Sequence, residues 1–300
     1  MIVIADLHIK SVEPFYSSIK QFLEHLIETY PNDEVVQLGD IFDTSTIHGD
    51  VLYEITDILK RFKKIHILQG NHDTSRRAGL LTKHMNHHDN IVVYDKMTEV
   101  EIEGHRCLMC PWIYNSKEVY EQVGWEGSYA FFHVTNPEDS FHEEDGVNTD
   151  KIKAYQVFGH THTSHYIRDN KIVLGIQIPS RNLETACDYL YVDKNGGKDF
   201  IVPPKYFEYQ DINYGEFPEN KNNIINVRNA PSFQSVWDMY KGYNVRREGI
   251  ELLRTENKED QEKVAFELGN IVEKFQGYST DKKLSKEVHE CGVKYLQEVM

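Results

Sequence analysis

The apolar positions in the N-terminal part of the chain follow two spacings. Short apolar runs at 2–5, 34–38 and 65–69 are typical of strands that are covered on both faces of a sheet. Between these runs, residues 13–29 and 51–62 repeat apolar side chains at helical spacing on one face. The order strand, helix, strand, helix, strand predicts a parallel sheet with right-handed crossovers.

The middle of the chain contains closely spaced strand patterns. We expect strands at 91–94, 98–103, 105–110, 129–133, 155–159, 165–168, 171–174 and 187–192. Together with the N-terminal elements they predict an α/β (α+β) fold, in which a two-sheet β-sandwich is flanked by helices. The paired prolines at 203–204 interrupt this pattern, because proline cannot continue a strand ladder or a helix. We therefore expect a domain boundary there.

Polar side chains follow many of the predicted strands directly. The segment HILQGNHDTSRR, residues 66–77, runs from an apolar strand straight into Gly70-Asn71-His72-Asp73. The other strand ends carry Asp6-Leu7-His8, Gly39-Asp40-Ile41-Phe42-Asp43, His133 and Gly159-His160-Thr161-His162. In open α/β sheets the carboxyl ends of the strands face one crevice, so we expect these side chains to converge.

Carboxylates, imidazoles and one amide make a mixed nitrogen and oxygen ligand set. Such a set suits divalent ions such as manganese, iron or zinc rather than a thiolate site. Glycine precedes Asp40, Asn71 and His160, which lets the backbone approach closely. A single His or Asp at a strand end is more often a turn residue or a cap. Five such motifs together indicate a two-metal site.

The motifs D-x-H, G-D-x-x-D, G-N-H-D, a lone His after a strand, and G-H-x-H occur in this order. They resemble the calcineurin-like metallophosphoesterase superfamily over roughly residues 1–200. The resemblance implies the metallophosphoesterase fold and hydrolysis of phosphoesters. The ligands that it implies are Asp6, His8 and His162 for one metal, Asn71, His133 and His160 for the other, and Asp40 as the bridge.

Three further residues are expected to act around the metals. By the resemblance, His72 binds no metal and acts on the scissile phosphate as a general acid or charge stabiliser. Asp43 and Asp73 are expected to orient the ligands or the His72 ring. We expect two divalent ions, Mn²⁺ in the first place, with Mg²⁺, Fe²⁺ or Zn²⁺ as alternatives. Two ions about 3.5–4 Å apart can activate a shared water molecule and hold the phosphoryl oxygens.

Within the superfamily, the sequence resembles a nuclease branch. The protein-phosphatase branch is expected to carry Arg-Gly after G-D-x-x-D, whereas Thr44-Ser45 stand here. The G-D-I-F-D form, the segment NIVVYDKMTEVEIEG before CLMCPW, and the segment GIQIPSRNLE look like the Mre-eleven/SbcD recombination nucleases, especially their compact phage versions. Gln177-Ile178-Pro179 departs from the bacterial pattern, in which Gly-Ser-Pro is common.

The charge distribution separates two segments. The formal net charge of −15 disfavours a passive basic coat for nucleic acid but does not exclude an enzyme that acts on phosphate. Residues 60–83 carry seven basic side chains and one acid, and we expect Arg76 and Arg77 to contact a DNA backbone. A solvated helix end explains the basic residues of 60–64 equally well. Residues 134–150 hold six acids and no base, and should repel DNA or restrict which strand enters.

Cysteine and tryptophan usage adds two expectations. The C-x-x-C at Cys107 and Cys110 lies in a predicted strand, where these positions point to opposite faces, so we expect buried thiols rather than a zinc knuckle. We interpret Trp112 as a core anchor, with a base-stacking platform as the alternative. No apolar run approaches the roughly 20 residues of a membrane span, and no signal-peptide pattern is found. We expect a cytoplasmic protein, in the host cytoplasm if it comes from a phage.

The chain changes character beyond Pro204. Residues 205–255 mix short strands with one helix near 233–240, as expected of the capping domain of these nucleases. Residues 256–300 contain two amphipathic helices, 258–275 and 281–299. In the family such a pair docks onto the coiled coil of an SMC-like ATPase. The alternative is that their apolar stripes pack on each other or on the cap. We assign residues 1–204 to the nuclease domain.

We therefore expect a dinuclear metal-dependent DNA nuclease, exonuclease or endonuclease, in a DNA repair or recombination complex. Its expected partners are duplex ends or single-stranded DNA and a Rad-fifty/SbcC-type ATPase, and a homodimer is left open. One alternative is a phosphodiesterase or phosphatase for small nucleotides. Another is a metal-free scaffold that keeps only the fold, and the intact ligand set argues against it.

Overall fold

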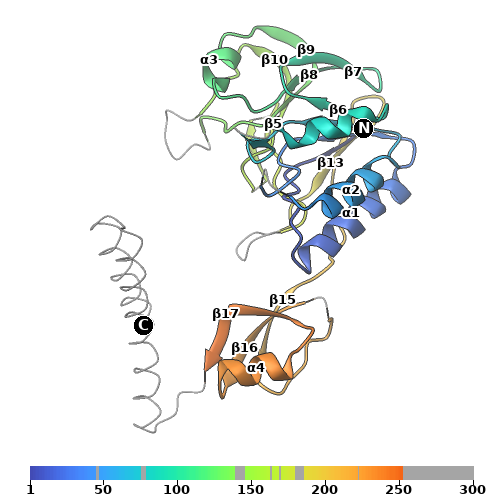
Figure 1. The fold of residues 1–300 in the computed structure, drawn as a ribbon. Helices are drawn as coiled ribbons and strands as arrows, with labels where there is room; N and C mark the ends of the chain where they lie inside the picture. The colour runs from blue at the N-terminus through green and yellow to red at the C-terminus, as the bar shows by residue number, and fades with distance from the viewer. Residues whose placement is uncertain are drawn as a thin grey trace, which may run out of the picture. The chain divides into compact units, whose positions relative to one another are not determined.

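A computed structural model describes residues 1–44, 47–75, 79–138, 146–162, 164–168, 170–179, 186–221 and 223–252 of the chain (Figure 1). The chain divides into two compact units. Of the described residues, the first comprises Met1–Glu208 and those of 220–224, and the second comprises Tyr209–Glu219 and 225–252. The prolines at 203–204 precede this division. The helical pair expected within 256–300 lies outside the described residues.

The first sheet joins four parallel strands to an antiparallel edge. Its order is β14 (Lys198–Ile201), β13 (Tyr189–Val192), β1 (Ile2–Ile4), β2 (Glu34–Gln37), β3 (Lys64–Leu68) and β6 (Ile91–Tyr94). The strands β1, β2, β3 and β6 are parallel neighbours, whereas β13 runs antiparallel to β1. Helix α1 (Phe15–Thr29) connects β1 to β2, and α2 (Gly49–Leu59) connects β2 to β3. The predicted parallel arrangement is confirmed.

The second sheet also has six strands, four of them parallel neighbours. Its order is β11 (His165–Arg168), β12 (Lys171–Val173), β10 (Ile152–Phe158), β9 (Trp125–Phe132), β8 (His105–Cys110) and β7 (Thr98–Ile102). The inner strands β12, β10, β9 and β8 are parallel neighbours, and both edge strands are antiparallel. Two such sheets with helices outside them confirm the predicted α/β fold, a two-sheet β-sandwich flanked by helices.

Some short elements were not predicted from the sequence. Between β3 and β6 the chain forms a small hairpin, β4 (Thr74–Ser75) and β5 (Gly79–Leu80), followed by a 3-10 helix, η1 (Leu81–His87). Helix α3 (Ser116–Tyr120) lies between β8 and β9.

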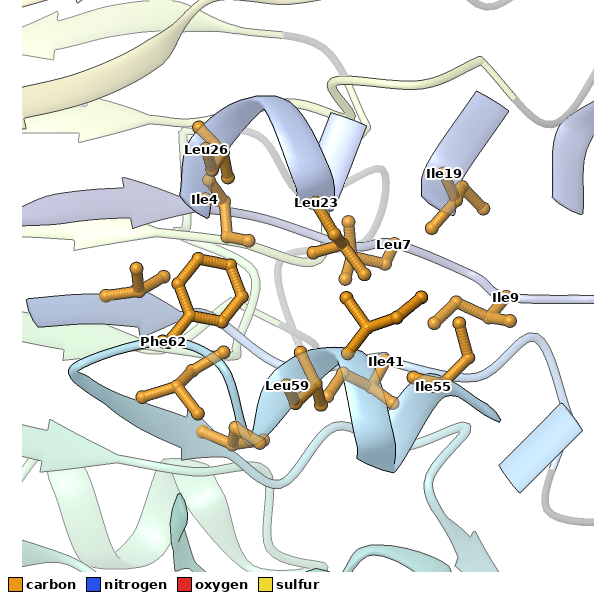
Figure 2. Packing of buried hydrophobic residues seen from close by; sticks show 14 of the residues in the cluster. Ile4, Leu7, Ile9, Ile19, Leu23, Leu26, Ile41, Ile55, Leu59 and Phe62 are labelled. Atoms are coloured by element: carbon orange, nitrogen blue, oxygen red, sulfur yellow. The ribbon is translucent and has the colours of Figure 1, made fainter. Parts of the chain in front are cut away.

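The alternation of side chains along the strands divides the core into layers. Ile2 and Ile4 of β1 face α1 and α2, where they pack with residues such as Leu23, Leu26 and Leu59 (Figure 2). The intervening Met1, Val3 and Ala5 pack in the cluster that joins the two sheets. Each fully buried side chain of this kind contributes about 1.5–3 kcal/mol. The core therefore fixes the ends of the first-sheet strands relative to those of the second sheet.

Strand β8 shows the same division in the second sheet. Cys107 packs between the sheets, whereas Cys110 packs on the outer face with Tyr120 of α3. Both cysteines are buried and free, and burial raises the pKa of the Cys107 thiol to about 12. The predicted pair of buried thiols on opposite faces is confirmed.

The second unit has a small core of its own. Strands β15 (Tyr209–Asn213), β16 (Ile224–Ala230) and β17 (Asn244–Leu252) form a sheet, and α4 (Phe233–Met239) is the helix expected in this region. The Ser232 hydroxyl caps α4 by accepting the Ser235 amide at 3.1 Å. None of the described helices combines the length and the apolar character that a bilayer crossing requires.

Candidate metal centre

The polar residues that follow the strands meet at one edge of the sandwich. Three groups each have ligand atoms within 4.8 Å of one another: Asp6, His8 and His162; His8, Asp40 and His72; and Asp40, His133 and His160. Asp6, His8 and Asp40 follow strands of the first sheet, whereas His133, His160 and His162 follow β9 and β10 of the second. The parallel strand order explains the convergence, because parallel strands end at the same edge.

Backbone strain is concentrated in the same residues. Among the described non-glycine residues, six have a positive φ, and four of them belong to these groups: Asp6 (35°), His8 (42°), Asp40 (50°) and His160 (78°). Each such conformation costs on the order of 1–3 kcal/mol and persists where the surrounding structure enforces it, as at ligand-binding sites. The positions of these side chains are therefore set by the fold rather than by local preference.

Two glycines allow the motifs to approach each other. Gly39 has a φ of +109°, and a Cβ there would lie 2.3 Å from Nδ1 of His133. A Cβ on Gly70 would lie 2.0 Å from Oδ1 of Asp40. Both distances are far below contact distance, so any side chain would displace a candidate ligand. The close approach predicted from these glycines is confirmed.

One half of the centre is built around His133. Its Nδ1 donates to the Leu38 carbonyl at 2.7 Å, so that Nε2 faces Oδ1 of Asn71 at 3.0 Å and Oδ2 of Asp40 at 3.2 Å. An imidazole whose second nitrogen donates to a carbonyl is the usual arrangement of a metal-binding histidine. Burial alone would lower the pKa of His133, but the Asp40 carboxylate outweighs it and raises this pKa to about 9. The Leu38 carbonyl and the side-chain oxygens of Asn71 and Asp40 all face nitrogens of the His133 ring. This arrangement requires a positive charge at the ring, either a proton or a metal ion.

The other half is built around His8. Its Nε2 lies 2.9 Å from Nε2 of His162 and 3.8 Å from Oδ2 of Asp40. Its buried Nδ1 lies 3.4 Å from Oδ1 of Asp43 without forming a hydrogen bond. Burial lowers the pKa of His8 to about 4, so its imidazole is neutral at neutral pH and offers a lone pair. Nitrogen lone pairs beside carboxylate oxygens fit a divalent cation.

The two carboxylates of the centre differ in their environment. Asp6 is fully buried and accepts the His160 amide at 3.0 Å, and burial raises the pKa of Asp6 to about 7. Burial opposes the ionisation of Asp40 as well, but His133 and His8 outweigh it and hold the pKa of Asp40 well below its usual range. Asp40 belongs to two of the ligand groups, so it is the carboxylate placed to bridge two ions.

His72 lies beside these groups. Its Nδ1 donates to the Asp43 carbonyl at 2.6 Å, and its amide donates to Oδ1 of Asp40 at 2.8 Å. The ring is perpendicular to that of His8, with 4.9 Å between the centroids. A ring nitrogen of His72 is close enough to His8 and Asp40 for the three residues to bind one ion. The expectation that His72 binds no metal therefore stays a prediction.

The comparisons with known proteins are consistent with this centre. The family model for calcineurin-like phosphoesterases matches residues 1–164, more than half of the chain. The chain belongs to this family. The phosphoesterase is thus a metal-dependent hydrolase of phosphoesters, and its His and Asp groups fit the divalent metals of the family. No protein with a curated description matches it.

Solved structures that are similar to the phosphoesterase include three from prokaryotes. An archaeal phosphodiesterase is 16% identical, with 67% of this chain and 98% of that chain covered and a TM-score of 0.40. The nuclease MPE of Pseudomonas putida is 19% identical, with 66% and 86% covered and a TM-score of 0.36. A protein of Aquifex aeolicus is 18% identical, with 52% and 88% covered and a TM-score of 0.30.

Asp73 of the phosphoesterase holds loops together. Its buried carboxylate accepts the amides of Gly70 at 2.9 Å, Phe42 at 3.2 Å and Ile41 at 3.4 Å. The loops after β2 and β3 are joined in this way. The side chain of Asp73 thus orients the Asp40 and Asn71 loops, whereas the His72 ring is oriented by the backbone carbonyl of Asp43. The sequence predicts that Asp43 and Asp73 orient the ligands or the His72 ring, without assigning either residue to one of these roles.

Two buried glutamines of the centre were missed in the sequence. Oε1 of Gln177 accepts the amide of Ala5, the residue before Asp6, at 2.8 Å, and its Nε2 donates to the Gly175 carbonyl at 2.6 Å. Gln37 makes paired hydrogen bonds to Gly39, the residue before Asp40. Both side chains satisfy backbone groups where strands end next to candidate ligands. A glutamine within an apolar strand run is the signal that could have identified them.

The expectations for DNA contacts have mixed outcomes. Arg76 and Arg77 lie outside the described residues, as do residues 139–145 of the acidic segment. Lys60 pairs with Asp57 at 2.6 Å and precedes the first residue of β3. The candidate ligand Asn71 follows the last residue of β3, at the opposite end of the strand. The interpretation of 60–64 as a solvated helix end is therefore favoured.

The interpretation of Trp112 as a core anchor is wrong. Trp112 is half-buried and does not belong to the hydrophobic clusters formed by the described residues. It lines a cavity that it shares with His160. Trp112 follows the end of β8 by two residues.

Proposed function

We propose that this phosphoesterase is a dinuclear metal-dependent DNA nuclease, with Mn²⁺ as its preferred ion. The observation that carries the proposal is the pair of ligand groups that share Asp40, one completed by His133 and His160 and the other by His8 and His72. A shared carboxylate between two such groups is the arrangement of two-metal phosphoester hydrolysis. When bound, two ions activate a water molecule and stabilise charge on the phosphoryl oxygens.

The protein's own contribution is to orient groups and to transfer a proton. The hydrogen bond from Nδ1 of His72 to the Asp43 carbonyl fixes the ring, so its Nε2 remains for the substrate. As a water oxygen bonds to phosphorus, the bond from phosphorus to the leaving oxygen breaks, and protonated Nε2 gives this oxygen its proton. Asp73 keeps the loops of Asp40 and His72 in place.

The finer assignment is to an Mre-eleven/SbcD-type recombination nuclease. It is supported by the G-D-I-F-D form and by the segments around CLMCPW and GIQIPSRNLE. The partner in this proposal is an SMC-like ATPase that docks onto 258–299 and supplies the basic surface that this acidic chain lacks. Nonspecific affinity for DNA comes from basic groups that release counterions, so a chain with a net charge of −15 gains little of it alone.

The test is a nuclease assay on linear duplex DNA, closed single-stranded circles and a small diester. It is run with Mn²⁺ or Mg²⁺, with and without the candidate ATPase, and with the Asp40→Asn variant as the inactive control. We expect degradation of linear duplex that stops when a chelator is added. Hydrolysis of the small diester without DNA degradation would favour the small-nucleotide alternative. A protein that binds no metal and hydrolyses none of the substrates would be a scaffold.

A further inference from the structure

A cavity next to the metal centre is not used by the chemistry described so far. Its volume is about 390 Å³, within the range of about 300–1,000 Å³ for small-molecule sites. Its lining includes Trp112, Tyr114, Val134, Val147 and, at the metal centre, His160. A candidate metal ligand thus forms part of the wall, and a group held in the cavity is adjacent to a phosphate held by the metals.

The aromatic side of the cavity is held in a fixed position. The Trp112 amide donates to the Gln69 carbonyl at 2.8 Å, and Nε2 of Gln69 donates to the Trp112 carbonyl at 3.2 Å. Gln69 lies two residues before Asn71, so the same strand end positions the tryptophan and a candidate ligand. The Ser116 hydroxyl closes the following turn through two hydrogen bonds to the backbone of Ile113.

The two rings of this wall are accessible. Trp112 is half-buried as a residue, and the Tyr114 ring packs against its ring edge to face, with 4.8 Å between the centroids. Tyr114 is 73% exposed, which is unusual for a large aromatic side chain that stabilises the fold. Fixed, exposed aromatic faces stack with nucleobases, and such stacking contributes about 1–3 kcal/mol per base.

We propose that this cavity binds the nucleobase of the nucleotide whose phosphate lies at the metal centre, with Trp112 as the stacking platform and Tyr114 at its edge. The inference rests on the proposed function, because it takes a nucleotidyl phosphodiester as the substrate. The site binds bases through their flat faces and therefore tolerates any sequence. The assigned ligand class is nucleotidyl esters rather than simple alkyl or aryl phosphodiesters.

Three substrates that release the same leaving group test the inference. They are the 4-nitrophenyl esters of thymidine 5′-phosphate and of the matching abasic sugar phosphate, and bis(4-nitrophenyl) phosphate. We expect Trp112→Leu to raise KM for the thymidine ester by about 5- to 150-fold, which corresponds to about 1–3 kcal/mol. Its KM for the other two substrates should not change. Trp112→Phe, which keeps a flat ring, should restore most of the affinity.

A matched control and a binding measurement complete the design. Tyr53→Ala removes an equally exposed tyrosine, 74% exposed, from α2, and should change none of these constants. The fluorescence of 2-aminopurine deoxyriboside 5′-monophosphate should be quenched by the wild type and by Trp112→Phe in the presence of Mn²⁺, and much less by Trp112→Leu.

The results separate the two proposals. Equal effects of Trp112→Leu on all three substrates, or quenching that survives this substitution, would overturn the base site and leave the nuclease assignment intact. Quenching that depends on Trp112, in a protein that hydrolyses none of the three esters, would support the base site and count against the proposed function.

Discussion

Oδ2 of Asp40 lies 3.2 Å from Nε2 of His133, and this contact joins the end of β2 in one sheet to the end of β9 in the other. His133 is oriented by the Leu38 carbonyl, from the same loop that presents Asp40. The protein's own contacts thus position the pair. This geometry makes Asp40 the most informative residue to replace.

Replacement of Asp40 should affect both metal sites, whereas replacement of His8 should affect mainly one. We expect Asp40→Asn to lower the number of bound Mn²⁺ ions further than His8→Ala does, because Asp40 is grouped with His8 and also with His133 and His160, whereas His8 is grouped with neither His133 nor His160. Elemental analysis after gel filtration gives the stoichiometry, with Asp57→Asn on the surface as the control. Equal metal losses in the two variants would remove Asp40 from its role as the shared ligand.

Replacement of His72 should separate turnover from metal binding. If the ring only donates a proton or stabilises charge, His72→Asn should reduce turnover of a small diester by about 10²–10⁴-fold and retain the bound metal. Turnover and metal content are measured on the same preparation. A matching loss of metal would instead make His72 a ligand, as its distance from His8 and Asp40 permits.

A methyl group at Gly70 should disturb the centre. Its Cβ would lie 2.0 Å from Oδ1 of Asp40, so Gly70→Ala forces the carboxylate or the loop to move. We expect a free energy of unfolding lower by about 1–3 kcal/mol, together with loss of metal. Gly124→Ala is the matched control, because a Cβ there meets no atom within 4 Å. Urea denaturation gives the free energy of unfolding, and elemental analysis gives the metal content. Equal values for Gly70→Ala and Gly124→Ala would mean that Gly70 serves only as a flexible residue.

The buried His66 should make the fold sensitive to acid. Its Nδ1 bonds to the Tyr94 hydroxyl at 2.8 Å and its Nε2 to Glu34 at 2.9 Å. Burial lowers the pKa of His66 below its ordinary value of 6.5, although Glu34 opposes this shift. The unfolded chain takes up a proton near pH 6.5 and the folded protein only at lower pH, so this stability is complete above 6.5 and is lost as the pH falls below it.

The difference between the wild type and His66→Gln tests this sign. Between about pH 7.5 and about pH 5.5, the wild type should lose more unfolding free energy than the variant, because the glutamine at position 66 does not titrate. Urea denaturation with a chelator present keeps metal binding out of the comparison. Parallel losses in the two proteins would assign the acid sensitivity to other residues.

The predicted C-terminal helices should be dispensable for the chemistry. We expect Phe275→Glu and Val288→Glu to abolish co-purification with the ATPase, because both lie on the apolar stripes of the predicted pair. Hydrolysis of a small diester should be unchanged. Glu290→Lys, which helical spacing puts off the stripe, is the control. Partner binding that survives deletion of 258–300 would refute the docking proposal.

Sequence patterns predicted the parallel strands and the convergence of polar residues because both depend on local periodicity and on the order of elements. Strand β9 begins at Trp125 rather than at residue 129, since its first half alternates between half-buried and exposed side chains and lacks the apolar run of its second half. The hydrogen bonds of Gln37 join it to Gly39, only two residues away, whereas the hydrogen bond of Gln177 could not be predicted in the same way. Such a hydrogen bond depends on the meeting of distant segments, as Gln177 meets Ala5.

The candidate ligands of each proposed ion come from both sheets, and this has a consequence for how the two layers stay together. An ion that binds Asp40 with His133, or His8 with His162, ties two separately hydrogen-bonded sheets at an edge where charged groups limit apolar packing. Metal binding then also stabilises the association of the two sheets. Neither sheet supplies all the candidate ligands of either proposed ion, so selection for metal-dependent catalysis would also maintain the cohesion of the sandwich.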